Sequence, residues 1–205
     1  MPKLQLTLAI IKPHAVKNPV ALSYIRNVIK DNFIVIKTKR MILDTEAAGN
    51  FYKEHVEKFF YNRLVTFMAS GSIDLHVMGH TQAVEVWRRM LGPTKVYRAQ
   101  FQEPYCLRGL FGISDTRNVA HGSDSESSAE REIKFFFPEF SFYNWHTNDE
   151  VRYRKGPIVF NNHLFQHVRK FTVREIQPAN RRIGRQSDSR GLVIGSDWHP
   201  SCTEP

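Results

Sequence analysis

The chain alternates between short apolar runs and longer stretches in which apolar residues recur every three or four positions. Short runs rich in Val, Ile and Leu are typical of buried strands, whereas the longer spacing is typical of helices packed on one face. The pattern predicts strands at residues 4–11, 33–43, 73–77 and 117–120, and helices around residues 22–29, 45–70, 83–91 and up to 136. Strands and helices therefore follow one another through most of the first 138 residues.

The order of these elements is strand, helix, strand, strand, helix, strand, with additional helical residues between the second and third strands. This order predicts an α+β domain with a ferredoxin-like βαββαβ antiparallel sheet. Residues 94–108 have no clear period, so we expect a long loop there, and such loops often carry function. We expect the domain to span residues 1–138, with residues 139–205 as a C-terminal extension.

The extension changes character along its length. Residues 140–145 are mostly aromatic and should pack back on the domain, whereas the residues after Pro178 are polar and basic and are predicted to be disordered. Residues 151–205 contain ten Lys and Arg against four Asp and Glu, a balance of +6 within the chain's formal +9. A basic tail can bind nucleic acid or an acidic partner. A solvated tail is the favoured interpretation, so we do not expect nucleic acid as a partner.

The composition narrows the cellular setting. Two cysteines, Cys106 and Cys202, argue against a framework of disulfides. No apolar run approaches the roughly 20 residues that a helix needs to cross a membrane, so we expect no membrane partner. The apolar stretch that begins at Leu4 leaves little room for a signal peptide. We therefore expect an intracellular protein, of the cytoplasm or the mitochondrion.

The segment 118–124 holds the strongest candidate for chemistry. Within it, His121 precedes small polar residues of the kinds that cap helix N-termini, and the residues beyond them have helical character. The free N–H groups of a helix N-terminus favour an anion, and a neutral imidazole is a nucleophile near pH 7. His121 is therefore a candidate to accept a phosphoryl group. Taken alone, a histidine beside a glycine is more commonly a simple turn residue.

Three separated motifs give the chain a family resemblance. They are Thr-Leu-Ala-Ile-Ile-Lys-Pro at residues 7–13, Phe-Tyr-Lys-Glu-His at residues 51–55 with Phe59 and Phe60 after it, and the segment 118–124 with Glu132 behind it. In this order and at these spacings, they make residues 4–138 resemble a nucleoside diphosphate kinase. Residues 67–71 and 87–94 resemble the divergent type-six branch of that family.

The resemblance implies ping-pong transfer of the terminal phosphoryl group from a nucleoside triphosphate such as ATP to a nucleoside diphosphate, with His121 phosphorylated in between. Mg²⁺ would be the cofactor, held mainly by the nucleotide phosphates rather than by protein ligands. The matching positions imply nucleotide-binding roles for Lys12, Phe60, Arg88, Thr94, Arg108 and Asn118. They imply supporting roles for Tyr52, His55, Ser123 and Glu132, with Glu132 orienting the imidazole. Lys and Arg suit phosphate oxygens, and an aromatic face can stack on any base.

The same residues also have structural interpretations. Lys12 alone is better explained as a solvated strand end, Phe60 as a core residue and Arg88 as part of a solvated helix face. The structural interpretations are less favoured for the charged and polar residues, because these residues match the positions of the family motifs all at once. The remaining histidines show no metal-ligand spacing, so we interpret them as structural.

Several residues depart from the family pattern. His14 follows the Lys-Pro pair where the family usually has aspartate, which predicts lower stability at the start of the next helix. Asp115 stands where common members have a small apolar residue near the base. The loop 94–108 is longer than in the common enzymes, where it helps to build a hexamer. We therefore doubt a hexamer and favour a monomer or dimer. A second hypothesis is a nucleotide-binding interaction module whose catalysis is weak or needs a protein partner.

Overall fold

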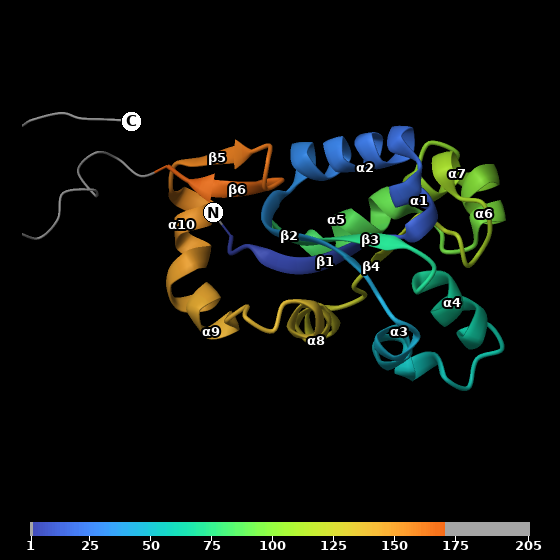
Figure 1. Cartoon of the computed structure of the whole chain (residues 1–205). Helices are drawn as coiled ribbons and strands as arrows, with labels where there is room; N and C mark the ends of the chain where they lie inside the picture. The colour runs from blue at the N-terminus through green and yellow to red at the C-terminus, as the bar shows by residue number, and fades with distance from the viewer. Residues whose placement is uncertain (1, 171–205) are drawn as a thin grey trace, which may run out of the picture. The chain divides into compact units, whose positions relative to one another are not determined.

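A four-stranded antiparallel sheet forms the centre of the protein (Figure 1). The computed structural model describes residues 2–170. The strands are β1 (Gln5–Ile11), β2 (Ile34–Ile42), β3 (Ser72–His80) and β4 (Ala120–Gly122), and they lie in the order β2-β3-β1-β4. β1 is thus an inner strand, and every residue in it after Gln5 is buried. Burial on both faces explains why this strand is apolar without interruption.

Helices connect the strands. Their bounds are α1 (Pro13–Lys17), α2 (Pro19–Asn32), α3 (Thr45–Phe51), the 3₁₀ turn η1 (Lys53–His55), α4 (Tyr61–Met68), α5 (Ala83–Leu91), α6 (Val96–Gln102), α7 (Leu107–Phe111) and α8 (Glu126–Phe136). The antiparallel sheet and the helices between its strands confirm the predicted α+β fold of ferredoxin-like order.

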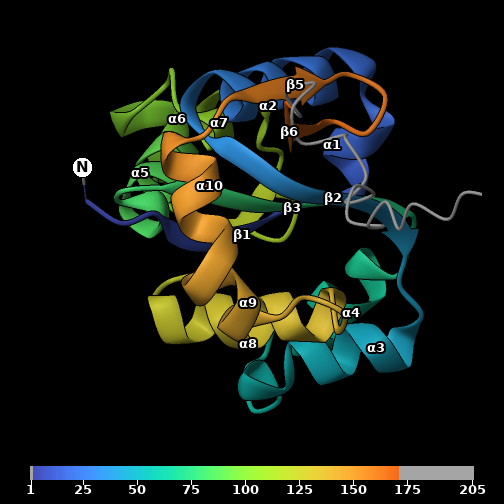
Figure 2. The same ribbon diagram turned by 90° about the vertical axis from the view of Figure 1, so that its left-hand side faces the viewer.

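The helices cover both faces of the sheet and create two cores (Figures 1 and 2). Successive side chains of a strand point to opposite faces. In β1, Leu8 and Ile10 pack with residues of α4 and α8, whereas Ala9 and Ile11 pack with residues of α2 and α5. A single strand therefore contributes alternate residues to each core, and this fixes the sheet between the two helical layers.

Some local predictions are wrong. The fourth strand is Ala120–Gly122 rather than residues 117–120, because the backbone turns at Val119, where φ is +75°. The expected irregular loop at 94–108 contains α6 and the start of α7. α6 buries only Val96 and Ala99, so its short sequence carries too few apolar positions to show a helical period.

The chain continues beyond α8 with further packed elements. They are α9 (Phe142–Asn144), the π-helical turn η2 (Trp145–Asp149), α10 (Glu150–Lys155), β5 (Ile158–Asn161) and β6 (Gln166–Arg169). Trp145 is buried in the core on the α8 side, and the Leu4 N–H donates to the Glu150 carboxylate at 2.8 Å. Residues up to Lys170 form one compact unit, so packed structure extends past residue 138, where we expect the domain to end.

The predicted disorder after Pro178 lies outside the described residues. Of the helices between residues 2 and 170, none combines the length and the apolar character that crossing a bilayer requires.

Candidate active site

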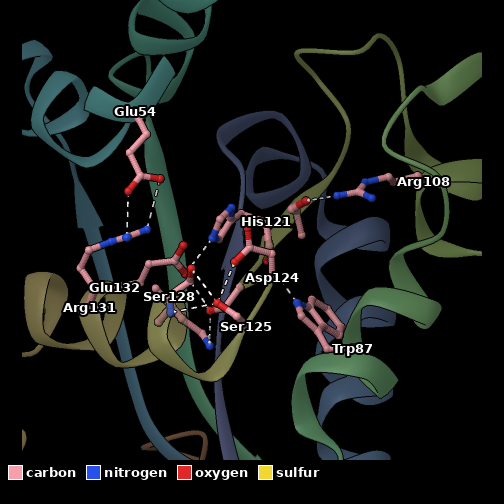
Figure 3. Close-up of polar contacts among 12 residues, drawn as sticks. Glu54, Trp87, Arg108, His121, Asp124, Ser125, Ser128, Arg131 and Glu132 are labelled. Carbon is pink, nitrogen blue, oxygen red and sulfur yellow. Dashed lines mark hydrogen bonds and ion pairs between the residues drawn. The ribbon is translucent and has the colours of Figure 1, made fainter. Parts of the chain in front are cut away.

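His121 lies in the short edge strand β4, opposite Ile10 of β1. Its main-chain carbonyl accepts a hydrogen bond from Trp87 Nε1 at 3.1 Å (Figure 3). Gly122 lies against the same indole, because a Cβ on this residue would be 2.5 Å from Trp87 Cδ1. A side chain at position 122 would therefore collide with the ring. The backbone of His121 is held between β1 and the indole of α5.

The backbone bends sharply just before β4. Val119 has a φ of +75°, which is rare for a β-branched residue. The Ala120 N–H donates to the Asn118 carbonyl at 2.9 Å, which closes a γ-turn around Val119. The Lys12 N–H donates to the Val119 carbonyl at 2.9 Å and holds the turn in place. Backbone strain of this kind costs on the order of 1–3 kcal/mol and is concentrated at functional sites.

Glu132 of α8 contacts the imidazole of His121 (Figure 3). Its Oε2 lies 2.9 Å from His121 Nε2 and also accepts a hydrogen bond from Ser123 Oγ at 2.7 Å. Ser123 Oγ in turn accepts from the Leu8 N–H at 3.2 Å, which ties this group to β1. Residues 121 and 132 would be about 16 Å apart on one helix. They meet because α8 begins only at Glu126 and the chain folds back before it.

This contact determines the form of the imidazole. An ionised carboxylate can only accept hydrogen bonds, so Nε2 carries the hydrogen and Nδ1 keeps its lone pair. The second ring nitrogen points away from Glu132 (Figure 3), and the side chain is 22% exposed. A nucleophilic nitrogen backed by a negative charge suits group transfer, because the carboxylate stabilises the positive charge that develops on the ring.

An aromatic wall surrounds His121. The rings of Phe51 and Tyr52 lie 5.5 and 6.5 Å from the imidazole in edge-to-face orientation. The Tyr52 hydroxyl is buried without a hydrogen-bond partner among the described residues. Burial and the neighbouring Glu132 raise the pKa of this hydroxyl well above its ordinary value. Tyr52 therefore keeps its proton and has a donor to offer. His55 stacks behind Tyr52, with 6.2 Å between the ring centres.

Lys12 and Asn118 form a buried pair at the end of β1. Lys12 Nζ donates to Asn118 Oδ1 at 2.7 Å and to the Thr116 carbonyl at 3.3 Å. Burial, together with the positive charge of Arg108, lowers the pKa of Lys12 to about 7. The ammonium group is thus easily deprotonated near neutral pH, and an anion beside it would restore its charge. The structure brings these two predicted residues together.

Arg108 is buried, and its guanidinium donates hydrogen bonds to three main-chain carbonyls. Nε donates to the carbonyl of Asn118 at 3.2 Å, Nη1 to that of Gly92 at 2.6 Å, and Nη2 to that of Ala120 at 3.2 Å. Burial and the charge of Arg88 lower the pKa of Arg108 to about 10, so it remains a cation at neutral pH. Two of its five N–H groups stay available for an anion. Its main contacts brace the turn that leads to His121.

Three predicted residues make their contacts with groups other than the imidazole. Arg88 is exposed on α5, and its charge acts on both Arg108 and Asp124. Thr94 is exposed, and its carbonyl accepts from Asn118 Nδ2 at 3.3 Å. Phe60 is half-buried at the start of α4, and its ring centre lies 5.7 Å from that of His55. In this structure none of the three has a hydrogen bond or ring contact to His121.

A cavity of about 510 Å³ lies beside the Lys12–Asn118 pair. Thr116, whose carbonyl accepts from Lys12, contributes to its wall together with Arg63, Phe67 and Arg117. The sequence motifs assign no binding role to these last three residues. Helical spacing was the available signal for Arg63, because it lies three positions after Phe60 and so shares one side of α4 with it.

The structure shows the contacts of Asp115 and His14, two residues that depart from the family pattern. Asp115 Oδ1 accepts from the Val96 N–H at 3.1 Å and so holds the first turn of α6. The His14 ring packs 5.6 Å from that of Phe67. Burial and the charge of Lys12 lower the pKa of His14 to about 4, so the ring is neutral at pH 7. It therefore brings no positive charge to the start of α1 at that pH.

Comparisons with known proteins agree with this geometry. Residues 5–142 match the family model described as nucleoside diphosphate kinase. The chain is 46% identical over 165 residues to nucleoside diphosphate kinase 6 of Xenopus tropicalis, covering 80% of this chain and 92% of the relative. It is 44% identical over 159 residues to nucleoside diphosphate kinase 6 of Homo sapiens, covering 77% and 86%.

A solved structure leads to the same family. The nucleoside diphosphate kinase of Aquifex aeolicus superposes with a TM-score of 0.62 at 33% identity, over 68% of this chain and 97% of that one. The first relatives are the type-six proteins, which is the branch indicated by residues 67–71 and 87–94. The chain therefore belongs to the nucleoside diphosphate kinase family and is most similar to its type-six branch.

Proposed function

We propose that the protein transfers the terminal phosphoryl group of a nucleoside triphosphate to a nucleoside diphosphate through a phosphorylated His121. The observation that carries the proposal is the 2.9 Å contact between Glu132 Oε2 and His121 Nε2. This contact leaves the Nδ1 lone pair as the nucleophile. Membership of a kinase family gives the proposal its reaction type.

In the first half-reaction, Nδ1 of His121 forms a bond to the γ-phosphorus while the bond to the β,γ-bridging oxygen breaks. The diphosphate departs with the electrons of that bond, and the ring becomes a cation beside Glu132. In the second half-reaction, a terminal oxygen of another nucleoside diphosphate attacks the phosphorus and the N–P bond breaks. The free imidazole is regenerated, so no external reactant is consumed.

Cationic and neutral donors around the turn would position the nucleotide. Lys12, which is bonded to Asn118, would contact phosphate or sugar oxygens, and Arg88 and the two remaining N–H groups of Arg108 would bind phosphate. The Tyr52 hydroxyl has no partner among residues 2–170 and can donate to an anion near the imidazole. Phe60, at the start of α4, offers a half-buried ring on which a base could stack.

Mg²⁺ would enter this site bound to the phosphates of the nucleotide. Between residues 2 and 170, no group of three His, Cys, Asp or Glu side chains is placed to hold a metal ion. The ion would take its ligands mainly from phosphate oxygens and water, and when bound it would neutralise charge on the phosphates.

Arg108 favours a second candidate function. Three of its five N–H groups are bonded to main-chain carbonyls, so a phosphate could use the remaining two but would have to compete with the carbonyls for the others. A site in which this guanidinium serves mainly as a brace would bind nucleotides yet transfer phosphate slowly unless a partner rearranges it. We propose this nucleotide-binding module with weak or partner-dependent catalysis as the alternative.

One labelling experiment separates the candidates. The purified full chain is incubated with Mg²⁺ and γ-labelled ATP, and GDP is then added. We expect acid-labile label on the protein that moves to GDP, and we expect none on His121→Ala. His163→Ala is the matched control, because His163 is exposed in the turn between β5 and β6 and should leave labelling unchanged. A folded protein that binds ADP but takes up no label would favour the second candidate.

A further inference from the structure

The cavity beside the Lys12–Asn118 pair has opposite charges on its walls. Its volume of about 510 Å³ lies within the range of roughly 300–1,000 Å³ that small-molecule sites occupy. The walls come from α4, from α6 and from residues 113–117, and Figure 1 shows both helices at the same end of the sheet. Arg63 and Asp115 both line the cavity. A site with a cation and an anion in its walls favours a ligand that carries both acceptors and donors.

The carboxylate of Asp115 is held at one oxygen and open at the other. Oδ1 accepts from the Val96 N–H at 3.1 Å, which fixes the side chain at the first turn of α6. Oδ2 has no hydrogen bond or ion pair with another residue between 2 and 170. Each carboxylate oxygen can accept two hydrogen bonds, so Asp115 can accept two donors of a ligand without losing Val96. Because the group is already fixed, binding costs little side-chain entropy.

The cavity adjoins residues that we propose to bind the nucleotide. The Thr116 carbonyl accepts from Lys12 Nζ at 3.3 Å, and Thr116 follows Asp115 directly and lines the cavity as well. A nucleotide whose sugar or phosphate oxygens contact Lys12 would therefore extend its base into the cavity. Arg63 shares one side of α4 with Phe60, so a base stacked on Phe60 would face Arg63 as well. This placement of the base rests on the function proposed above.

We propose that Asp115 selects guanine nucleotides by accepting hydrogen bonds from the N1–H and the 2-amino group of the base. Guanine presents these two donors side by side, and its O6 and N7 acceptors suit the guanidinium of Arg63. Adenine and cytosine present an amino group beside a ring nitrogen whose lone pair repels a carboxylate. Uracil presents one N–H between two carbonyl oxygens, which repel it as well. Of the common bases, guanine alone therefore matches a carboxylate with two hydrogen bonds.

The test measures equilibrium binding of GDP, ADP and xanthosine diphosphate to the full chain in the presence of Mg²⁺. In Asp115→Asn, the amide oxygen can still accept from the Val96 N–H, but the amide nitrogen places a donor where the carboxylate had an acceptor. Xanthine has a carbonyl where guanine has its 2-amino group, so it matches the amide. Asp44→Asn is the control, because Asp44 also caps a helix, through the Ala47 N–H at 2.7 Å, but does not line the cavity.

We expect the parent chain to bind GDP about tenfold more tightly than ADP, a modest factor for a pair of hydrogen bonds because Asp115 is exposed. Asp115→Asn should bind GDP about tenfold more weakly than the parent and xanthosine diphosphate more tightly, without weakening ADP. The control should behave like the parent chain. If Asp115 only supported α6, Asp115→Asn would change the affinities for all three nucleotides alike, and that result would overturn the proposal.

A variant of the opposite wall keeps the test informative if Asp115→Asn does not fold. Arg63→Met removes the donors for O6 and N7 from an exposed helix position, and it should weaken GDP roughly fivefold more than ADP. Equal affinities of the parent chain for GDP and ADP would refute guanine selection and leave the proposed phosphoryl transfer standing. A folded parent chain that binds none of the three nucleotides would instead refute the proposed function, and guanine selection with it.

Discussion

The two edges of the sheet are built in opposite ways. β4 has three residues, carries His121, and leaves the imidazole 22% exposed beside a carboxylate. β2 has nine residues, and its neighbour on β3, His76, is fully buried beneath a hairpin. A short edge has few unpaired backbone groups, so it can remain open for chemistry at little risk of mispairing. Beside the long edge, the β5–β6 hairpin places the Phe165 ring 5.2 Å from the ring of His76. The turn at Val119 before β4 and the hairpin beside β2 are both features that the apolar pattern of the strands does not predict.

The histidines on the β2 side of the sheet resist protonation. Burial lowers the pKa of His76 to about 3, and burial also holds the pKa of His167 below its usual value. The charged groups that face His76 are Asp74, which raises its pKa, and Arg26 and Arg40, which lower it. Unfolding exposes these histidines to water, where they bind protons more readily. The unfolded state therefore gains protons first as the pH falls.

We expect stability to be fully retained above pH 6.5 and lost as the pH falls from 6.5 toward 3. Each pH unit in this range removes up to about 1.4 kcal/mol per buried histidine. Urea unfolding measured at several pH values would show the loss, and His76→Gln should flatten part of it. A His76→Gln profile that matches the parent would mean that the β2 side does not control acid stability.

The next prediction concerns the β4 edge and its packing. Gly122→Ala would place a Cβ 2.5 Å from Trp87 Cδ1, so either the indole or the strand must move. We expect a loss of about 1–3 kcal/mol in unfolding free energy, together with slower labelling of His121. Gly71→Ala is the control, because its Cβ would come no closer than 3.6 Å to Pro13 Cβ. Equal stability of the two variants would show that the indole does not hold the backbone of His121.

The fold follows from the sequence more directly than the contacts of the candidate site do, for identifiable reasons. Strands β1, β2 and β3 have seven to nine residues each, and each contains an apolar run or an alternation of apolar and polar residues that predicts a strand. β4 was misplaced because its position depends on the strained turn at Val119, which no pattern of apolar residues encodes. The motifs predict one site that contains His121, Glu132, Lys12 and Asn118. In the structure His121 contacts Glu132, and Lys12 contacts Asn118. The brace formed by Arg108 depends on main-chain carbonyls, which sequence motifs do not show.

The β5–β6 hairpin illustrates the other limit of sequence reasoning. Residues 158–169 contain two short strands with little apolar alternation, and their role depends on where the edge of the sheet lies. That position follows only from the strand order. Long-range contacts such as Val35 to His167, 132 residues apart, have no local signal in the chain.

The smallest expected effect concerns Lys12, beside the β4 edge. Its pKa of about 7 means that the ammonium is largely charged at pH 6 and largely neutral at pH 8. A polyphosphate binds the charged form better, so affinity for ADP should fall as the pH rises through 7, by at most about tenfold per unit. Calorimetric titration with ADP between pH 6 and 9 would measure this slope. Lys12→Arg should bind with little dependence on pH over the same range, because arginine stays protonated. A parent chain whose affinity is as flat as that of Lys12→Arg would mean that the proton on Lys12 plays no part in binding.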